Sequence, residues 1–454
     1  MFDVMLERFF EDSGRIFIRG SLFDESRENG TPLQTNQTYI RQFSTGANFK
    51  SKTIGDFSLR SYIGSQVFDQ GFSAVAAGRN SESLTRSQRT PAQQFGIASQ
   101  WSRSAGTRQT LVAGFDFREV RGASDEIVFN GGRATSAVGA GGRERAFGIF
   151  AQDIIGITQK FFATIGGRVD RWRNYDALSA NKSFSTGATT ATVFNPRTET
   201  AFSPRLSLLY KLNENLTLTA SGYRAFRAPT LNELYRSFRV GNVVTQANDK
   251  LLAERLTGAE AGASVNALRQ RLYLRGSFFW SELTRPVANV TLSVTPELIT
   301  RQRQNLGRTR SRGVEIESEA RITNTVSLTA GYLLADATVL QFPANRVLEG
   351  LLIPQVARHQ FTFQARYANP FILTFAVQGR AIGAQFDDDQ NQLKLNKYFV
   401  LDALASRRLN NHFDVFVAVE NVFNQRYDIG RTNVTTIGPP TLARAGFRLN
   451  FGAK

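Results

Sequence analysis

Few residues of this 454-residue chain have the types and spacing that metal binding or catalysis requires. The two histidines, His359 and His412, lie far apart, and neither has a histidine or cysteine at ligand spacing. The run Asp387–Asp389 offers carboxylates to a hard cation, although a solvated acidic loop also accounts for it. The stretch Gly131–Gly142 lacks the Gly-Lys-Ser/Thr ending of a phosphate-binding loop. We therefore predict no catalytic residue, no metal site, no cofactor and no enzyme activity.

The elements that position these residues are predicted from turns that alternate between short and long. The short turns are polar and lie between apolar-alternating runs: Glu11–Gly14, Ser104–Gly106, Leu212–Glu214, Thr323–Asn324, Asn369–Pro370 and Leu409–Asn411. The long polar stretches are Gly122–Gly142, Arg173–Thr198, Arg227–Arg255, Val339–Gln355 and Asn424–Thr441. Bacterial outer-membrane barrels have this arrangement, with short turns in the periplasm and long loops outside the cell.

The runs between these turns alternate with a period of two, which places successive side chains on opposite faces of a strand. In the last run the apolar face is predicted to contact lipid: Ala445, Phe447, Leu449 and Phe451. The polar face is predicted to face the lumen: Arg444, Arg448 and Asn450. A soluble β-sandwich also alternates, but a whole chain of such hairpins favours an all-β, antiparallel transmembrane barrel. We predict about 19 strands, each supplying the ~9–11 residues that a tilted spanning strand needs.

The amino-acid composition is consistent with a barrel, and the net charge indicates which kinds of molecule the chain attracts. Hydrophobic residues make up 41% of the chain and the mean hydropathy is −0.25. No run of about 18 apolar residues is present, so no transmembrane helix is predicted. The net charge of +17 fits a solvated basic surface, or attraction to an anionic ligand or to lipopolysaccharide phosphates. Nucleic acid is not expected, because the arginines do not form one patch with stacking aromatics.

The chain is predicted to be one domain over residues 1–454, because no linker divides it. Its first residues lack the basic, apolar and small-residue regions of a signal peptide. The inferred odd strand count implies at least one missing strand upstream, because bacterial single-chain barrels have even numbers of strands. We therefore expect an N-terminally truncated barrel with either a wide, unplugged lumen or a seam where the first and last strands pair poorly.

A basic segment, Arg301–Arg312, gives the most informative charge pattern. Arg301 and Arg303 share parity with Glu315 and are predicted to face the lumen. Arg308, Arg310 and Arg312 share parity with apolar residues. Because arginine at the bilayer midplane costs ~2–4 kcal/mol, these three should lie above the hydrocarbon, unless a bulge near a glycine resets the parity. In the first case lipopolysaccharide phosphates are natural partners, and ordinary loop charge is the alternative.

Six segments from about residue 200 onward resemble motifs of one family. Tyr223–Tyr235 reads YRAFRAPTLNELY and resembles the "FRAPxLxEL" signature of TonB-dependent outer-membrane receptors. The other five follow in the family's order: Asn248–Glu254 with Glu260–Gly262, Asn305–Gly307 with Gly313–Glu317, Phe386–Asn391, Glu420–Tyr427, and Gly438–Arg444. The segment Asn248–Glu254 is a partial match, because both family prolines are replaced. The chain is thus similar to TonB-dependent receptors.

The resemblance implies a barrel of about 22 strands whose lumen is closed by an N-terminal plug. Neither the plug nor its TonB box is found, so the chain is expected to be the C-terminal majority of such a receptor, engaging TonB only through a plug outside it. The expected location is the bacterial outer membrane, with outer-membrane lipid and lipopolysaccharide as neighbours.

The implied function is uptake of a scarce nutrient, namely an iron chelate, a corrinoid or an oligosaccharide. The alternative is a passive pore or structural barrel without TonB coupling. The loop residues that we single out for ligand binding are Arg236, Phe238, Arg239 and Tyr427. They are equally suited to packing loops together, and the ligand itself stays open because fold does not dictate function.

Overall fold

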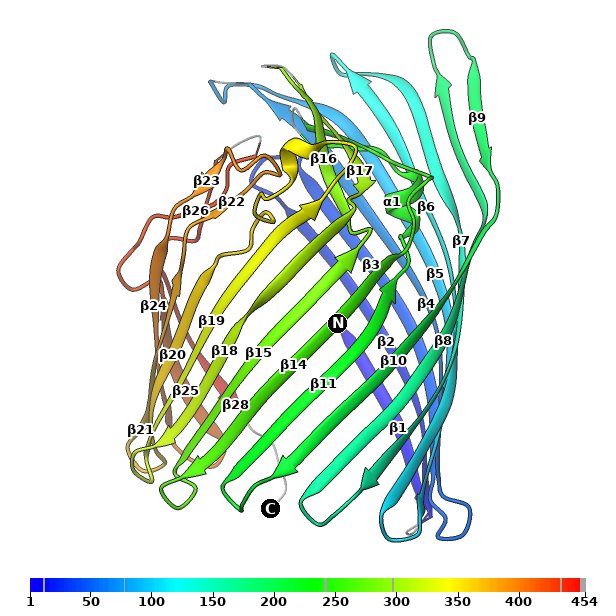
Figure 1. The fold of residues 1–454 in the computed structure, drawn as a ribbon. Helices are drawn as coiled ribbons and strands as arrows, with labels where there is room; N and C mark the ends of the chain where they lie inside the picture. The colour runs from blue at the N-terminus through cyan, green and yellow to red at the C-terminus, as the bar shows by residue number, and fades with distance from the viewer. Residues whose placement is uncertain (11–12, 77, 241–242, 296–297, 433–434, 450–454) are drawn as a thin grey trace.

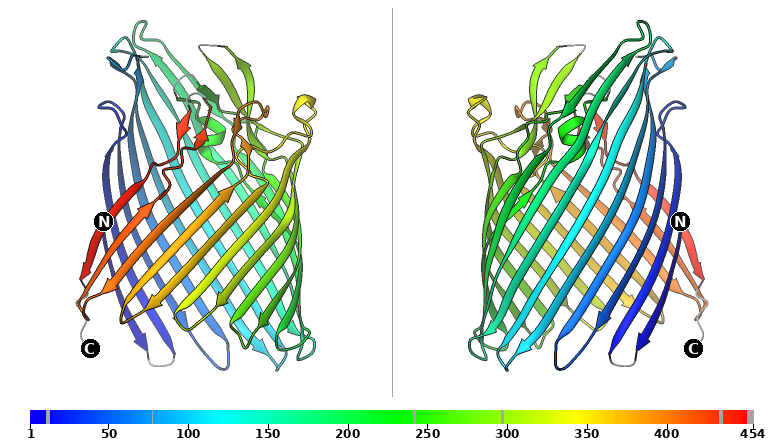
Figure 2. Two further views of the ribbon diagram at one scale, coloured as in Figure 1. Left: turned by 90° about the vertical axis from the view of Figure 1, so that its left-hand side faces the viewer. Right: turned by 90° about the vertical axis from the view of Figure 1, so that its right-hand side faces the viewer.

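A computed structural model describes all residues except 11–12, 77, 241–242, 296–297, 433–434 and 450–454. Within the described residues, one antiparallel sheet contains twenty strands and curls into a barrel (Figures 1 and 2). The wall strands are β1 (Phe2–Phe10), β2 (Gly14–Glu28), β3 (Thr35–Phe49), β4 (Asp56–Val75), β5 (Glu82–Ala105), β6 (Gln109–Asn130), β7 (Arg133–Gly156), β8 (Phe161–Ser183), β10 (Arg197–Lys211), β11 (Leu216–Arg227), β14 (Glu254–Ala267), β15 (Leu272–Thr284), β18 (Arg308–Arg321), β19 (Val326–Gln341), β20 (His359–Asn369), β21 (Leu373–Ile382), β24 (Tyr398–Arg408), β25 (Phe413–Glu420) and β28 (Leu442–Leu449).

The twentieth strand, β9 (Thr189–Phe194), pairs only with the outer end of β8, which leaves nineteen strands in the wall, the predicted number. The other elements lie in the extracellular loops: β12 (Phe238–Val240), β13 (Val243–Gln246), β16 (Val287–Val294), β17 (Ile299–Asn305), β22 (Gln385–Phe386), β23 (Lys394–Leu395), β26 (Asp428–Gly430), β27 (Thr436–Ile437), helix α1 (Leu231–Tyr235) and the 3-10 turn η1 (Arg346–Leu348). Thr230–Tyr235, a loop segment whose sequence is able to form a helical turn, contains α1 and its N-cap.

The short turns at one end of the barrel are closed by their own side chains. Thr158, Asn213 and Thr323 each accept hydrogen bonds from two backbone N–H groups, two and three residues further along the chain. Asn369 and Asn410 each accept one from the residue two positions on. Such side chains satisfy backbone groups that the sheet leaves unpaired at the turn.

Two stretches predicted to be loops are instead mainly strand. Residues 122–142 belong to β6 and β7, which are joined only by Gly131 and Gly132 at φ values of 56° and 78°. Two positive φ values define the tight turn that continues the twist of a hairpin. Residues 173–198 likewise extend β8 and form β9. These hairpins rise above the rest of the wall (Figure 1), where both faces meet water and the apolar alternation that marks membrane strands is absent.

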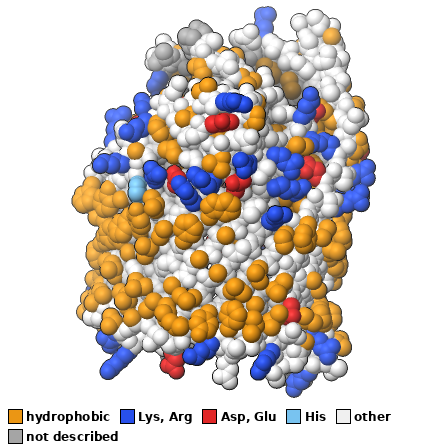
Figure 3. Space-filling view, in the orientation of Figure 1, with side chains coloured by type: hydrophobic (Ala, Val, Ile, Leu, Met, Phe, Trp, Pro, Cys, Tyr) orange, Lys and Arg blue, Asp and Glu red, His pale blue; other side chains and the backbone are white. Residues whose placement is uncertain are grey.

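Alternation in the wall produces an apolar outer belt. Figure 3 shows apolar side chains around the visible face, with charged side chains above and below. Phe278 of β15 lies opposite Ala261 and Val314 on the adjacent strands and is 51% exposed. A wide exposed apolar surface of this kind is a membrane contact in a stable protein. In a separate observation, no helix among the described residues is long and apolar enough to cross a membrane.

The ladder does not continue across the barrel's two terminal strands. Among the described residues, β1 pairs only with β2, and β28 pairs only with β25. Every residue of β1 is exposed. The expected weak pairing of first and last strands is therefore present as a seam between the two.

We predict that Phe278→Arg impairs membrane insertion far more than Ser277→Arg. Position 278 faces hydrocarbon, where arginine costs ~2–4 kcal/mol near the midplane. Position 277 lies on the opposite face beside Glu315, which would pair with a new arginine. Urea titration of the two variants in lipid vesicles measures the difference. Equal loss of folding free energy at both positions would contradict the assignment of faces.

Candidate functional site

The connection between β11 and β14 folds over the extracellular mouth and forms a small core there. Thr230 caps α1, accepting from the Glu233 backbone N–H at 3.2 Å, while the Glu233 carboxylate accepts from the Thr230 N–H at 2.8 Å. This reciprocal pair is the capping box that the T-x-x-E spacing favours. Leu234 and Tyr235 pack against Trp172 of β8, and the Tyr235 hydroxyl donates to Asn174 Oδ1 at 2.5 Å. Burial raises the pKa of Tyr235, so it remains a donor.

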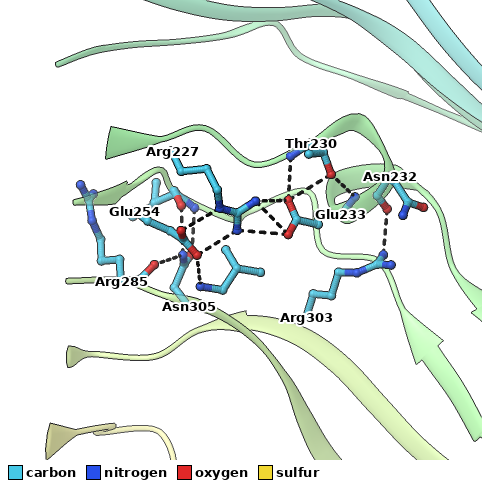
Figure 4. Close-up of polar contacts among 10 residues, drawn as sticks. Arg227, Thr230, Asn232, Glu233, Glu254, Arg285, Arg303 and Asn305 are labelled. Carbon is cyan, nitrogen blue, oxygen red and sulfur yellow. Dashed lines mark hydrogen bonds and ion pairs between the residues drawn. The ribbon is translucent and has the colours of Figure 1, made fainter. Parts of the chain in front are cut away.

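Arg227 at the end of β11 joins the two ends of this loop (Figure 4). Its Nε lies 2.7 Å from Glu254 Oε2, and its Nη1 lies 2.9 Å from Glu233 Oε2. Glu254 also accepts from the Val287 backbone N–H at 2.7 Å. Burial alone would raise the pKa of Glu233, but hydrogen bonds from Arg227 and Thr230 more than offset it and lower that pKa. The network therefore favours the charged form of Glu233 and fastens Glu254 through the same arginine.

Arg303 of β17 ties the loop to the extracellular four-stranded sheet β12-β13-β17-β16. It is buried, and its Nη1 donates to the carbonyls of Asn232 and Arg236, each at 2.8 Å. Its guanidinium lies 5.1 Å from the centre of the Phe238 ring. Burial lowers the pKa of Arg303 from its usual value, and carbonyl and ring contacts replace the water it has lost. Arg301 and Arg303 were predicted, from shared parity with Glu315, to face the lumen. They belong instead to this separate sheet, whereas Glu315 lies in the wall strand β18.

A cavity of about 220 Å³ lies between the loop and the inner side of the tall hairpins. Its polar lining comes from β6, β8, β9 and the loop: Ser124, Glu126, Ser179, Asn181, Thr190, Thr192, Tyr235, Arg236 and Ser237. Glu126 is nearly inaccessible and accepts from Arg86 Nη1 at 2.5 Å, Gln88 Nε2 at 2.5 Å and Arg236 Nε at 3.3 Å. Two arginines thus share one carboxylate, which leaves positive charge for an anionic group.

The predicted ligand residues do not form one site. Arg236 lines the cavity, and its guanidinium lies 5.5 Å from the ring of Phe238. Arg239 is exposed on β12, opposite Val244. Tyr427 lies elsewhere, 7% exposed and stacked on Tyr398 at 4.2 Å between ring centres. Only Arg236 is placed where a ligand entering the cavity would meet it, and whether any of the four binds ligand remains a prediction.

The polar residues predicted for the last strand are only partly described. Arg444 forms an ion pair with Glu420 of the neighbouring β25. Arg448 lies opposite Asp414 in the same ladder. Both alternate with Ala445, Phe447 and Leu449, and their exposure to the lumen stays a prediction. Asn450 and Phe451 lie outside the described residues.

The acidic run Asp387–Asp389 is neither a solvated loop nor gathered around a cation. Asp387 accepts from the backbone N–H groups of Arg431 and Thr432 at 2.7 and 2.5 Å. Asp388 accepts from Leu393 N at 2.7 Å, and Asp389 accepts from Thr291 N at 2.9 Å and Thr291 Oγ1 at 2.7 Å. Each carboxylate therefore fastens one loop. No group of three metal-ligating side chains occurs among the described residues.

Sequence reasoning missed Glu126, which lines the cavity, and Arg86 and Gln88, which donate hydrogen bonds to it. They lie on strands that were predicted in part to be loops, and no local pattern marks them. Alternation along β5 and β6 would place these side chains on one face of the sheet. That inference requires knowing that both strands continue above the membrane.

We predict that Arg227→Met loosens the loop of residues 228–253. It leaves Glu233 and Glu254 without their charged donor, and each carboxylate loses hydrogen bonds worth about 1.5–3 kcal/mol. Faster hydrogen exchange or proteolysis within this loop measures the effect. In a Glu233→Gln/Glu254→Gln background the same change should cost much less, and an equal cost there would contradict the network.

A pH effect follows from the lowered pKa of Glu233. Its contribution to loop stability is present above the unfolded-state pKa, near 4.5, and is lost as pH falls through the lower folded pKa. Hydrogen exchange within α1 should therefore accelerate below about pH 4. Glu233→Gln should remove this acid sensitivity, and an unchanged pH profile would contradict the assignment.

Comparison with known proteins shows which family has this architecture. A family model described as TonB dependent receptor-like, beta-barrel, matches residues 7–422. The catecholate siderophore receptor Fiu of Escherichia coli strain UTI89 is 22% identical over 319 residues, covering 67% of this chain and 41% of that protein. The metal-pseudopaline receptor CntO of Pseudomonas aeruginosa is 23% identical over 290 residues, which cover 62% of this chain and 37% of that protein. The chain thus spans less than half the length of these curated relatives.

Solved structures agree in fold. The closed form of the ferric-catecholate receptor Fiu from Escherichia coli K12 gives a TM-score of 0.79 at 16% identity, covering 99% of this chain and 74% of that one. The copper transporter OprC gives a TM-score of 0.82 at 15% identity, and the match covers 99% of this chain and 72% of that one. With the family model matching most of its length, the chain belongs to the TonB-dependent receptor-like β-barrel family and is an outer-membrane protein.

Proposed function

We propose that this chain forms the barrel of a receptor that takes up a metal chelate across the outer membrane. Three alternatives for the nutrient follow from the sequence, namely an iron chelate, a corrinoid and an oligosaccharide. The names of the relatives concern a catecholate siderophore and a metal-pseudopaline complex, and those of similar structures concern ferric chelates and copper. These names support the first alternative.

The cavity at the mouth carries the proposal. Arg236 and Glu126 line it together with hydroxyl groups of serine and threonine, and Arg86 contacts the Glu126 carboxylate from outside the lining. A site of this kind suits an anionic, oxygen-rich group, because arginine recognises carboxylate and similar anions through charged hydrogen bonds. Its aromatic residue, Tyr235, is only 4% exposed, so within the described lining no open ring offers a sugar a stacking surface.

The size of the cavity limits what enters it. A volume of about 220 Å³ is below the roughly 300–1,000 Å³ typical of a whole small-molecule site. We infer that one arm of a chelate enters between Tyr235 and Ser179, while the metal centre remains above the loop. Release into the periplasm would require TonB acting through a plug domain, so energy-driven uptake is proposed only for the barrel acting with such a plug.

A passive pore is the alternative from another functional class. Membership of the receptor family favours coupled uptake over a pore. The folded loop supports the same choice, because α1 packs against β8 at the loop end of the barrel (Figure 1). A general pore has no need of a polar cavity formed partly by its own loop.

We predict that Arg236→Gln weakens binding of a ferric catecholate chelate by about tenfold, because one charged hydrogen bond is lost. Quenching of tryptophan fluorescence in the detergent-solubilised chain measures binding, since Trp172 lies beside the loop. Arg346→Gln, at an exposed arginine of η1 outside the cavity, is the matched control and should bind as the unchanged chain does. Tighter saturable binding of a corrinoid or a maltooligosaccharide would overturn the choice of ligand, and equal loss in both variants would overturn the site.

A further inference from the structure

Five arginines lie together on the outward face of β6, β7 and β8, on the side of the extracellular loops. This β6–β8 arginine cluster consists of Arg121, Arg143, Arg145, Arg171 and Arg173. Their parity is that of the apolar belt: Arg121 follows Phe117 on β6, and Arg145 precedes Phe147 on β7. All but the half-buried Arg143 are exposed. The cluster therefore sits immediately above hydrocarbon, at the level of lipid headgroups.

The register places arginines directly opposite one another. Arg121 pairs with Arg143 across β6 and β7, and Arg145 pairs with Arg173 across β7 and β8. Like charges directly opposite in a sheet are destabilising. Because the sheet contains two neighbouring pairs of this kind, we expect a bound anion to offset the repulsion between their positive charges.

Carboxylates on the same face compensate only in part. Glu119 accepts from Arg145 at 2.9 Å, and Asp176 lies 3.7 Å from Arg143. Two carboxylates against five guanidinium groups leave a clear positive excess. The ring of Tyr175 lies 5.3 Å from Arg145 and 5.4 Å from Arg173, which orients both guanidinium groups without neutralising them.

The arginines that the sequence singled out for phosphate are a poorer site. Arg308 lies 3.2 Å from Glu282, and Arg312 lies 3.3 Å from Asp336, which Arg358 also contacts at 3.2 Å. These residues do lie on the outward face, since the β15–β18 register runs unbroken from Arg308 past Gly313. Glu282, which also lies opposite Arg310 in the ladder, and Asp336 leave fewer arginines unmatched here than on β6–β8. The greater demand for an external anion therefore lies on β6–β8.

An apolar groove adjoins the cluster. It has a volume of about 970 Å³ and runs along the same outward face across β1 to β7. Phe43, Ile63 and Phe95 form its apolar part, and Arg121 and Arg143 lie at its polar edge. Ile63 is 57% exposed. The arrangement places an anion-binding edge next to a surface for hydrocarbon chains, which is the chemistry of an anionic lipid.

We propose that the β6–β8 arginine cluster binds the diphosphorylated, acylated end of lipopolysaccharide in the outer leaflet. Each like-charged pair, Arg121 with Arg143 and Arg145 with Arg173, takes one phosphate, and the acyl chains cover Phe95, Ile63 and Phe43. Two pairs match two phosphates, whereas a phospholipid headgroup would fill one. The β6–β8 arginine cluster lies on the loop side of the apolar belt, so it would meet lipids of the outer leaflet. The site is independent of the nutrient proposed above.

The test compares two double variants of the full chain in nonionic detergent. Arg121→Gln/Arg143→Gln should bind diphosphorylated lipid A at least about tenfold more weakly than the unchanged chain. Arg308→Gln/Arg312→Gln, which removes two outward arginines that have carboxylate partners, should bind within about twofold of it. Native mass spectrometry of bound lipid and the rise in Tm on adding lipid A give two readouts.

A charge reversal separates binding from structure. Arg121→Glu places a carboxylate opposite Arg143, so the Tm without lipid should stay the same or rise while lipid A binding is lost. A fall in the lipid-free Tm of this variant would show that Arg121 stabilises the fold itself and would overturn the proposal. So would equal weakening in the two double variants, unchanged binding in Arg121→Gln/Arg143→Gln, or equally tight binding of phosphatidylglycerol.

Discussion

The structure depends on one constraint: inside the hydrocarbon every backbone N–H and C=O must find a partner within the protein. The continuous antiparallel ladder from β1 to β28 meets it across almost the whole wall. The alternation of side chains follows, because a strand paired on both edges can present only its two faces to lipid and lumen. The seam between the first and last strands is where the described ladder leaves this requirement unmet.

Above the membrane the constraint relaxes, and arginine takes over as the residue that holds the loops. Arg227 joins both ends of the α1 loop, and Arg303 fastens that loop to β17. The carboxylates of Asp387 and Asp389 play the complementary part in the later loops. The planar, permanently charged guanidinium suits these places, because it satisfies several carbonyls or carboxylates at once. Much of the basic composition is therefore structural, and only groups with unmatched charge point to ligands.

The wall was predictable from the sequence, and the mouth was only partly so. A period of two and polar short turns act locally, so they foretold the nineteen wall strands and the face of Arg312. The helical turn at Thr230–Tyr235 is local in the same way, because its capping box joins residues only three apart. Residues 122–142 were predicted to be a loop but are mainly strand. Water meets both faces of these strands, so the sequence there is rich in glycine and alanine and shows no alternation of apolar and polar residues. Arg303 was misjudged because its partners, Asn232 and Arg236, come from a loop some seventy residues earlier, a contact that no local pattern encodes.

The side-chain-capped turns at the short end also shape the order in which the barrel assembles. Thr158, Asn213 and Thr323 fix their turns through neighbours no more than three residues away. Closing so short a loop costs little chain entropy, so we expect each hairpin to be able to form from its own local contacts. Register is then set at the turn, where a slip of one residue would send an entire apolar row toward the lumen. The small polar residues at the tips thus act as kinetic guides, although they contribute nothing to the belt that lipid finally covers.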